Sequence, residues 1–336
     1  VREILAKLGY RSLDEVIGRT ELLRQVSRGA EHLDDLDLNP ILAKVDAPDS
    51  ARRFSIPTFR NEVPDSLDAQ MIHDARPVFE RREKMQLTYN VRNTHRAVGT
   101  RLSSEITRLY GMKDLSEGHV HVRLRGSAGQ SLGAFLCQGI TLEVFGDAND
   151  YVGKGLSGGT IIIRPTVSSP LTSQQNSIIG NTVLYGATSG RLFAAGQAGE
   201  RFAVRNSGAH VVVEGCGSNG LEYMTGGMAV ILGKVGSNFG AGMTGGMAFV
   251  LDTERDFVDM ANPDSIIWQR LESTYWEDAL KALITEHAEK TDSAWSKSII
   301  EDWDRRRSEF WQICPKEMRT RLSQPLSDHE TLEAAE

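Results

Sequence analysis

Cysteine is scarce in this 336-residue chain and is poorly placed for cofactor chemistry. The three cysteines, Cys137, Cys216 and Cys314, lie 79 and 98 residues apart, and no two of them form a Cys-x-x-Cys pair. Neither an iron–sulfur cluster nor a structural zinc site can be built here from close pairs. Scattered cysteines in odd number are instead typical of a reducing compartment.

Excess basic charge and long apolar runs are also lacking. The formal net charge is −7, from 38 Lys and Arg against 45 Asp and Glu, whereas nucleic-acid binding needs a concentrated basic face. No apolar run approaches the roughly 18 residues that cross a bilayer, and the N-terminus has no signal-peptide pattern. We therefore expect a cytoplasmic protein that binds neither nucleic acid nor a membrane.

Glycine is abundant in one region, because 26 of the 32 glycines lie between Gly126 and Gly246. A step made of a small residue followed by glycine, with Gln138 in place of the small residue in the first case, recurs there at Gly139, Gly158, Gly190, Gly208, Gly226 and Gly245. The successive spacings of these glycines are 19, 32, 18, 18 and 19, which indicates a regular repeat with one insertion. A short apolar run, such as residues 160–163 or 210–213, follows each of the last five steps.

Repeats of this length must stack, because one short strand cannot bury its own apolar side chains. So short a repeat also leaves no room for a helical return. We therefore predict a mainly β fold, a single-stranded right-handed parallel β-helix with flanking α-helices at both ends. The expected domains are a linker over residues 1–80, the β-helix over 81–255 and a helical tail over 256–336.

Two Gly-x-Gly-x-x-Gly patterns occur within the repeat, at Gly153, Gly155 and Gly158 and at Gly240, Gly242 and Gly245. Such a pattern can cradle a phosphate when a strand precedes it and a helix follows it. Here the strand-like residues 160–163 and 247–250 follow instead. We favour turns between strands over a phosphate site.

Polar side chains that could act in catalysis or metal binding are few and scattered. His119 and His121 alternate with valines and could chelate a metal from one side of a strand, but no third ligand is signalled, so a polar strand face is favoured. His210 is expected to form hydrogen bonds at a corner. No catalytic, cofactor-binding or metal-binding residue is assigned. Ion pairs or contact with a partner domain are expected of Arg191, Glu200, Arg201 and Arg205.

The segments before the repeat predict short regular elements. Alternation over residues 85–91 indicates a strand, and helical spacing over residues 102–109 indicates a helix that ends at Gly111. Residues 12–15 read Ser-x-x-Glu, which resembles a capping box and predicts a short helix ending near Gly18.

The tail predicts further helices. Asp292 or Ser293 is the expected N-cap of one of them. The tail tryptophans, Trp276, Trp295 and Trp303, are expected to anchor these helices, with a ligand-binding aromatic box as the alternative.

Four glycine-rich stretches carry a resemblance to a known family: residues 146–159, 180–209, 222–227 and 238–252. They resemble the C-terminal Gly-x-Gly-x-Gly domain of the glutamate synthase large subunit. Residues 1–18 resemble the stretch that leaves the flavin domain of that family, and residues 303–318 resemble its terminal helix and tail. The chain, which opens at Val1, looks like a piece of something longer.

The resemblance implies an oxidoreductase of ammonia assimilation that acts on CH–NH2 donors. The complete enzyme would make two L-glutamate from L-glutamine and 2-oxoglutarate, using FMN, a 3Fe–4S cluster and electrons from NADPH or ferredoxin. Its glutaminase, central and FMN domains would be the partners, together with a small FAD/NADPH subunit. This part is expected to be a scaffold that holds no cofactor and is not catalytic alone.

Other interpretations remain open. The chain could be a free-standing β-helix scaffold subunit of a glutamate-synthase-like amidotransferase or of a complex resembling formylmethanofuran dehydrogenase. The linker-like character of residues 1–80 favours the glutamate synthase interpretation over this one. A β-helical lyase acting alone is more distant, because its site would need clustered acids and bases.

Overall fold

The computed structural model describes residues 1–44, 46–48, 50–51, 55 and 65–329. The chain forms two compact units, Val1–Pro64 and Asp65–Glu336. The first unit contains only short helices, and Leu5 is the one buried apolar residue among its described positions. These helices are α1 (Arg2–Leu8), η1 (Thr20–Leu22), α2 (Glu31–Asp34) and α3 (Asn39–Leu42).

The capping-box prediction for the first unit is wrong. Residues 11–17 form bends and turns rather than a helix. The Glu15 carboxylate accepts a hydrogen bond from the backbone N–H of Arg11 at 2.9 Å, so it closes a local turn and does not reach Ser12. Helix α1 ends at Leu8, where Gly9 takes the left-handed conformation at φ 79°.

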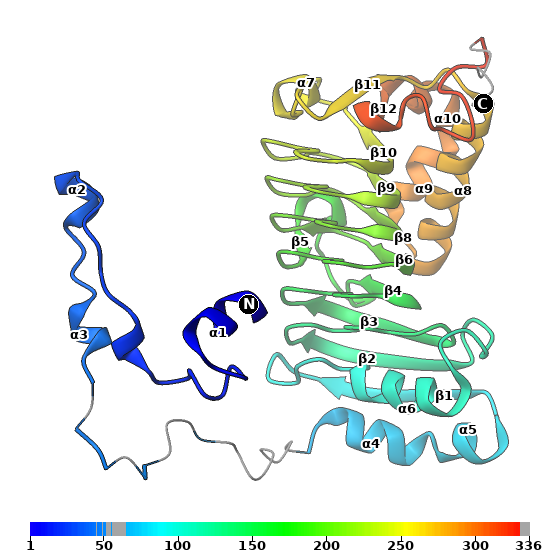
Figure 1. Cartoon of the computed structure of the whole chain (residues 1–336). Coiled ribbons are helices and arrows are strands. Elements are labelled where there is room, and N and C mark those ends of the chain that lie inside the picture. The colour runs from blue at the N-terminus through cyan, green and yellow to red at the C-terminus, as the bar shows by residue number, and fades with distance from the viewer. Residues whose placement is uncertain (45, 49, 52–54, 56–64, 330–336) are drawn as a thin grey trace. The chain divides into compact units, whose positions relative to one another are not determined.

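The second unit is built on one 12-stranded sheet (Figure 1). Eight strands run parallel in the order β1-β2-β3-β4-β6-β8-β9-β10, and β12 and β11 continue the sheet in antiparallel pairing. Two short strands, β5 and β7, pair beside this path. The bounds are β1 (Met85–Val91), β2 (Val120–Ala128), β3 (Ile140–Ala148), β4 (Ser157–Arg164), β5 (Ser177–Ile179), β6 (Ser189–Ala194), β7 (Gln197–Ala198), β8 (Ser207–Val213), β9 (Thr225–Ile231), β10 (Gly245–Leu251), β11 (Ile266–Arg270) and β12 (Phe310–Pro315).

The predicted single-stranded right-handed parallel β-helix is therefore wrong, and the architecture is an α/β fold on an open, mostly parallel sheet. The strand positions were predicted correctly, but the remainder of each repeat was not. It forms a return loop, by which we mean the segment between two consecutive strands of the parallel series. Many return-loop residues have positive φ, among them Phe135, Leu184 and Ala203, and a left-handed backbone cannot continue an extended strand.

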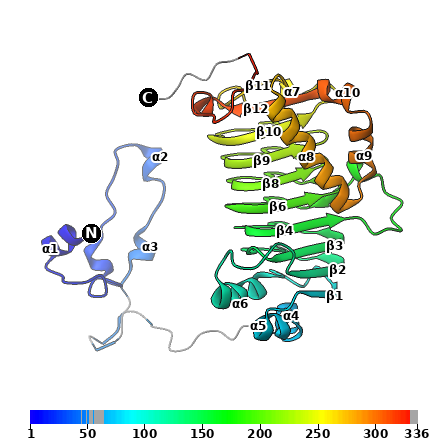
Figure 2. The same cartoon turned by 90° about the vertical axis from the view of Figure 1, so that its right-hand side faces the viewer.

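The two faces of the sheet are covered differently. On the loop face, a row from Leu142 through Ile161 and Leu192 to Val211 packs against apolar side chains of the return loops. The alternate residues, such as Phe193, lie on the helix face, where helices cover them (Figure 2). These helices are α8 (Thr274–Thr291), α9 (Ala294–Glu301) and α10 (Trp303–Arg306). Side chains alternate along a strand, so both faces must be apolar where both are covered.

Helices also close the β1 end of the sheet, where α4 (Leu67–Asp74) and α5 (Arg76–Arg81) lie beneath β1 (Figure 1). The predicted strand and helix are confirmed as β1 and α6 (Thr100–Tyr110). Asp68 of α4 is buried, and its carboxylate accepts hydrogen bonds from the backbone N–H of Gly99 at the start of α6, at 2.9 and 3.2 Å. The remaining elements are η2 (Ser173–Gln175), α7 (Phe257–Met260), η3 (Arg307–Glu309) and η4 (Lys316–Met318).

The predicted tryptophan anchors are confirmed. Trp276 packs within the cluster beneath α8 and donates from its indole nitrogen to the carbonyl of Pro325 at 3.0 Å. Trp295 donates to the carbonyl of Leu232 at 2.7 Å. Ser293 is the N-cap of α9, as one of the two predicted alternatives, and its hydroxyl accepts from the N–H of Ser296.

Candidate functional site

The Gly-x-Gly-x-x-Gly patterns serve the packing of the return loops. A Cβ at Gly153 would lie 2.8 Å from the Cδ2 of buried Leu184, and a Cβ at Gly155 would lie 2.5 Å from the ring of Phe135. In the second pattern, Gly240 faces Ile266 and Gly242 faces the ring of Tyr223 in the same way. Strands β4 and β10 follow the patterns, so no helix N-terminus points at a phosphate. The interpretation as turns between strands is confirmed.

A charged groove crosses the part of the helix face that α8 leaves bare. Its centre is Glu143 on β3, whose side chain is only 10% exposed. Glu143 Oε2 lies 3.0 Å from His121 Nε2 and 3.1 Å from Arg123 Nε, both on the neighbouring strand β2. The hydrogen bond and charge of His121, reinforced by Arg123, hold the pKa of the Glu143 carboxyl below its ordinary value.

Helix α8 supplies the other wall of this groove. Arg191 Nη1 on β6 lies 2.6 Å from Glu286 Oε1, and Lys290 Nζ lies 3.7 Å from the same oxygen. The hollow between these pairs and Glu143 has a volume of about 640 Å³. A second hollow of about 470 Å³ continues it and shares Glu117 and Arg191 with it.

His210 faces the second hollow from the middle of β8. The predicted position at a corner is therefore wrong, because His210 pairs with Arg191 in the parallel ladder. Burial, and then the charge of Arg191, lower the pKa of the His210 ring, while Glu286 opposes this shift. The ring is therefore neutral near pH 7.

His119, which directly precedes β2, and His121 of β2 do not form a chelating pair. His121 contacts Glu143, whereas His119 Nε2 lies 3.1 Å from the backbone carbonyl oxygen of Arg82. Among the described residues, no group of three or more His, Cys, Asp or Glu side chains is placed to hold a metal ion. Glu143 and Glu286 are each paired with a cation of the same fold. Such pairing suits a polar contact surface better than acid–base catalysis.

The arginines singled out in the sequence form local contacts. Arg191 pairs with Glu286, and Arg201 Nε lies 3.0 Å from Glu222 Oε2, so the predicted ion pairs are confirmed for these two. Arg205 has a different partner, since its guanidinium stacks over the ring of Tyr223 at 5.5 Å from the centroid.

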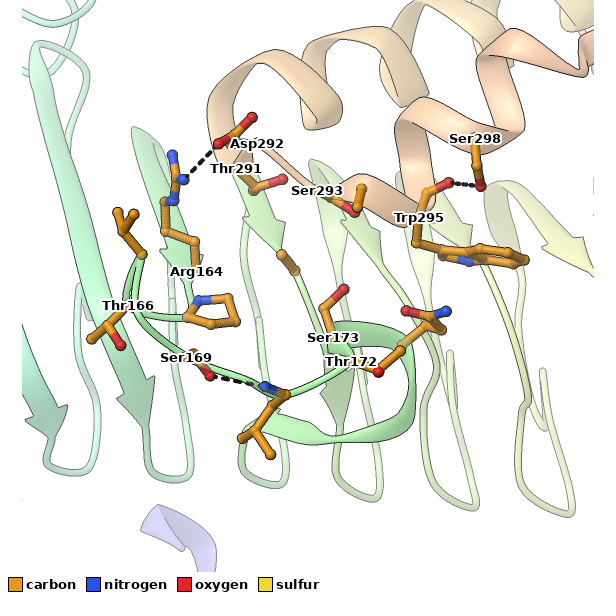
Figure 3. Close-up of a pocket in the computed structure, with 16 residues that line it drawn as sticks. Arg164, Thr166, Ser169, Thr172, Ser173, Thr291, Asp292, Ser293, Trp295 and Ser298 are labelled. Carbon is orange, nitrogen blue, oxygen red and sulfur yellow. Dashed lines mark hydrogen bonds and ion pairs between the residues drawn. The ribbon is translucent and has the colours of Figure 1, made fainter.

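A separate cavity of about 590 Å³ opens where the insertion after β4 meets the junction of α8 and α9 (Figure 3). Hydroxyl groups dominate its lining, with Ser169, Ser173 and Ser293 among them. Arg164 Nη2 lies 3.2 Å from Asp292 Oδ2 at one end. These groups neutralise one another, so the cavity carries little net charge.

The groove could not be seen in the sequence, because residues that pair within it, such as Arg191 and Glu286, are 95 positions apart. One signal was available. Glu143 interrupts the apolar run of residues 140–145, and a lone acid inside a buried strand requires a partner. The spacing of Glu286 and Lys290 by four residues also marks one polar face of α8.

The sequence comparisons agree with the glycine-based organisation. The family model described as "GXGXG motif" matches residues 68–316, and the chain belongs to this family. It is 67% identical over 326 residues to "Glutamate synthase [NADPH] large chain" of Azospirillum brasilense, an overlap of 97% of this chain and 22% of that relative. The predicted similarity to glutamate synthase large subunits is confirmed.

Two further relatives show the same partial overlap. "Ferredoxin-dependent glutamate synthase 2" of Synechocystis is 44% identical, with 94% of this chain and 20% of the relative covered. "Glutamate synthase [NADPH] large chain" of Bacillus subtilis is 41% identical, with 96% of this chain and 21% of the relative covered. The chain spans about a fifth of the length of the curated relatives it matches.

The cysteines do not fit an iron–sulfur cluster, which needs converging thiolates. All three are free and buried. Burial raises the pKa of Cys216 to about 12 and that of Cys314 to about 11, so both remain thiols at neutral pH. Cys314 also lies in the cluster of the helix face, whereas Cys137 and Cys216 belong to the loop-face core.

Within the described residues, no helix is both long and apolar enough to span a bilayer.

Proposed function

We propose that this chain is the scaffold part of a glutamate synthase large chain. The whole enzyme would make two L-glutamate from L-glutamine and 2-oxoglutarate with reducing equivalents, as an oxidoreductase acting on CH–NH2 donors. The observation that carries this proposal is the 67% identity across 97% of the chain to a fifth of such an enzyme. The division into a linker (1–80), a glycine-repeat domain (81–255) and a tail (256–336) belongs to the same proposal.

The scaffold role is supported by the chemistry of the described residues. Glu143 and Glu286 in the charged groove are paired with neighbouring cations, the glycine patterns fill space in turns, and the cysteines are buried thiols. FMN, the 3Fe–4S cluster and the site for electrons from NADPH or ferredoxin would therefore lie in other domains. The free cysteines also support a cytoplasmic location.

The first unit supports the proposal that the partners are other domains of the same large chain. Eleven large apolar side chains between Val1 and Ile41 are exposed, against one that is buried, Leu5. A segment with so little core of its own is expected to lie on the surface of a larger body. The proposed partners are the glutaminase, central and FMN domains, and a small FAD/NADPH subunit.

A chimera tests the proposal. In the complete Azospirillum brasilense large chain, the matching segment is replaced by this sequence, and formation of glutamate from glutamine and 2-oxoglutarate is measured. We expect a rate comparable with that of the parent, and loss of activity when the segment is deleted. A soluble but inactive chimera would contradict the proposal.

The isolated 336-residue protein provides a second readout. We expect it to be colourless, to contain no iron and to hydrolyse no glutamine. Flavin at one equivalent per chain in this preparation would overturn the assignment of the redox chemistry to other domains.

A further inference from the structure

An apolar pocket of about 310 Å³ opens on the helix face of the sheet, beside α8 and the segment that follows β12. Five side chains form its apolar walls, and we refer to it as the methionine pocket. They are Met228 of β9, Met247 of β10, Trp276 of α8, and Met318 and Leu322 of the segment after β12. Three thioethers and an indole make this pocket chemically unlike the charged groove and the hydroxyl-lined cavity.

The register of the sheet determines where the pocket lies. Arg191, His210, Met228 and Met247 are consecutive partners across β6, β8, β9 and β10, so their side chains form one row on the helix face. Figure 2 shows α8 crossing these strands obliquely. The row changes from polar to apolar between His210 and Met228. His210 therefore lines both the second hollow of the groove and the methionine pocket.

Neighbouring groups already hold two of the walls in place. The Trp276 indole donates to the carbonyl of Pro325 at 3.0 Å, and its ring centroid lies 6.5 Å from that of Phe249. Gln312 Nε2 lies 3.6 Å from Met247 Sδ. Trp276 is only 8% exposed and Met247 only 3%. Walls that are ordered before binding lose little further entropy when a ligand enters.

Glycine leaves bare backbone beside the methionines. Gly227 and Gly246 line the pocket and directly precede Met228 and Met247. Their φ values are 86° and 85°, and a Cβ at Gly227 would lie 2.3 Å from the carbonyl oxygen of Ala209. A Cβ at Gly246 would lie 2.8 Å from the carbonyl oxygen of Gly227. These glycine steps therefore let a ligand approach the backbone closely.

A few polar groups converge on the pocket, namely His210, Arg321 and Ser323. Among the described residues, the exposed Arg321 guanidinium has no ion pair or hydrogen bond, and no acidic side chain lines the pocket. The His210 ring is neutral near pH 7, so it supplies hydrogen-bonding capacity without charge. An apolar cavity with a few convergent polar groups is typical of a small-molecule site.

Size, open apolar surface and charge together favour one kind of occupant. Met228, Met318 and Leu322 are only half-buried, and covering apolar surface gains about 25 cal/mol per Å². The volume lies at the lower end of the roughly 300–1,000 Å³ of ligand pockets, so it suits a small molecule. The unpaired positive charge of Arg321 favours an anion, and a carboxylate matches the guanidinium geometry.

We propose that the methionine pocket binds a small carboxylic acid. Its apolar body lies between the methionines and Trp276, and its carboxylate pairs with Arg321. This inference goes beyond the proposed function and does not rest on it, because every contact comes from the second unit of this chain. A ligand in this position contacts the sheet, α8 and the segment after β12 at once, so its binding stabilises the folded unit.

NMR of ¹³C-labelled methionine methyl groups tests the site, with 4-phenylbutyrate as the probe at pH 7. The 336-residue protein contains nine methionines. We expect saturable shifts at Met228, Met247 and Met318, with a dissociation constant of about 1 mM or lower. Met112, which is 48% exposed, is the matched control and should not shift. Absence of saturable shifts, or equal shifts at Met112, would overturn the proposal.

The neutral 4-phenylbutanamide separates charge from shape. It should bind about fivefold more weakly than the acid, because it forms no ion pair with Arg321. Arg321→Gln should weaken binding of the acid by about the same factor and leave that of the amide unchanged, whereas Arg321→Lys should retain most of the difference. Arg321 is exposed, so thermal unfolding of both variants should match the parent. Equal affinities of acid and amide for the parent protein would overturn the proposed ligand class.

Two other occupants are outcomes of further measurements. Shifts of the three pocket methyl groups on dilution without probe would assign the pocket to a second copy of the chain. In the active chimeric large chain, titration calorimetry should detect probe binding that Arg321→Gln weakens. Its absence there would show that another domain fills the pocket, and would overturn the small-molecule proposal. An inactive chimera would count against the proposed function and leave the result on the 336-residue protein standing.

Discussion

The hydroxyl of Ser293, the N-cap of α9, donates a hydrogen bond to Oε1 of the buried Glu214 at the end of β8. His287 of α8 is also fully buried, and its Nε2 lies 3.5 Å from the same oxygen. The two residues joined by the hydrogen bond are 79 positions apart. This contact fixes the corner between α8 and α9 on the sheet.

Replacing Ser293 with alanine should destabilise the protein by about 2 kcal/mol, because the N-cap is lost and a buried carboxylate loses its donor. Urea unfolding at pH 7 measures the effect. Ser298→Ala is the matched control, since Ser298 donates only to the carbonyl of Trp295 within the same helix and should cost less. Equal effects of the two variants would show that the contact with Glu214 adds nothing.

Gly153 and Gly186 allow a packing effect to be separated from backbone strain. Their φ values are 64° and 67°, but a Cβ at Gly153 would meet buried Leu184, whereas nothing lies within 4 Å of a Cβ at Gly186. Gly186→Ala should lower the free energy of unfolding by about 1 kcal/mol through positive φ alone. Alanine at Gly153 should cost about 1–3 kcal/mol more through overpacking, as measured by thermal or urea unfolding. Equal losses would contradict the packing role.

Glu143 should contribute to acid sensitivity. Its pKa is lowered in the folded state, so its stabilisation is present above the ordinary value of 4.5 and is lost as the pH falls through the folded pKa. Glu143→Gln should therefore reduce the dependence of unfolding free energy on pH below 4.5. Glu83→Gln is the control, because Glu83 has a lowered pKa but an exposed side chain, and solvent screening should leave its effect smaller. A larger effect at Glu83 would contradict the role of the groove.

His210 should affect the free energy of unfolding in a higher pH range than Glu143 does. Its folded pKa lies below the ordinary 6.5, so the unfolded chain binds a proton first and stability falls as the pH drops below 6.5. His210→Gln should flatten unfolding free energy between pH 7 and about 5. The charged groups that shift its pKa are Arg191 on the neighbouring strand β6 and Glu286 on α8, so Arg191→Gln should shift the His210 titration upward in NMR. A downward shift would contradict this electrostatic explanation.

Several parts of the fold could be predicted from sequence because their cause is local. The alternation of residues 85–91 and the apolar runs after each glycine step marked strands that the structure contains. The path of the chain between strands could not be predicted from the same pattern. Apolar residues of a return loop, such as Val152 and Leu184, are buried just as strand residues are, so the composition of the repeat does not distinguish a loop from a second strand.

The functional surfaces depended even more on tertiary structure. Glu143 and Arg123 meet because β2 and β3 pair in register, and Arg191 meets Glu286 because α8 packs across the sheet.

The sequence by itself determined where the strands lie, where the chain must turn and which family the chain resembles, since glycine spacing and alternating apolar residues act over a few positions. Only the tertiary structure decided that each repeat contributes one strand to an open sheet, and that charged side chains from β2, β3, β6 and α8 gather in one groove. The physical reason is that left-handed loop conformations and ion pairs across the sheet depend on neighbours that are close in space but distant in sequence.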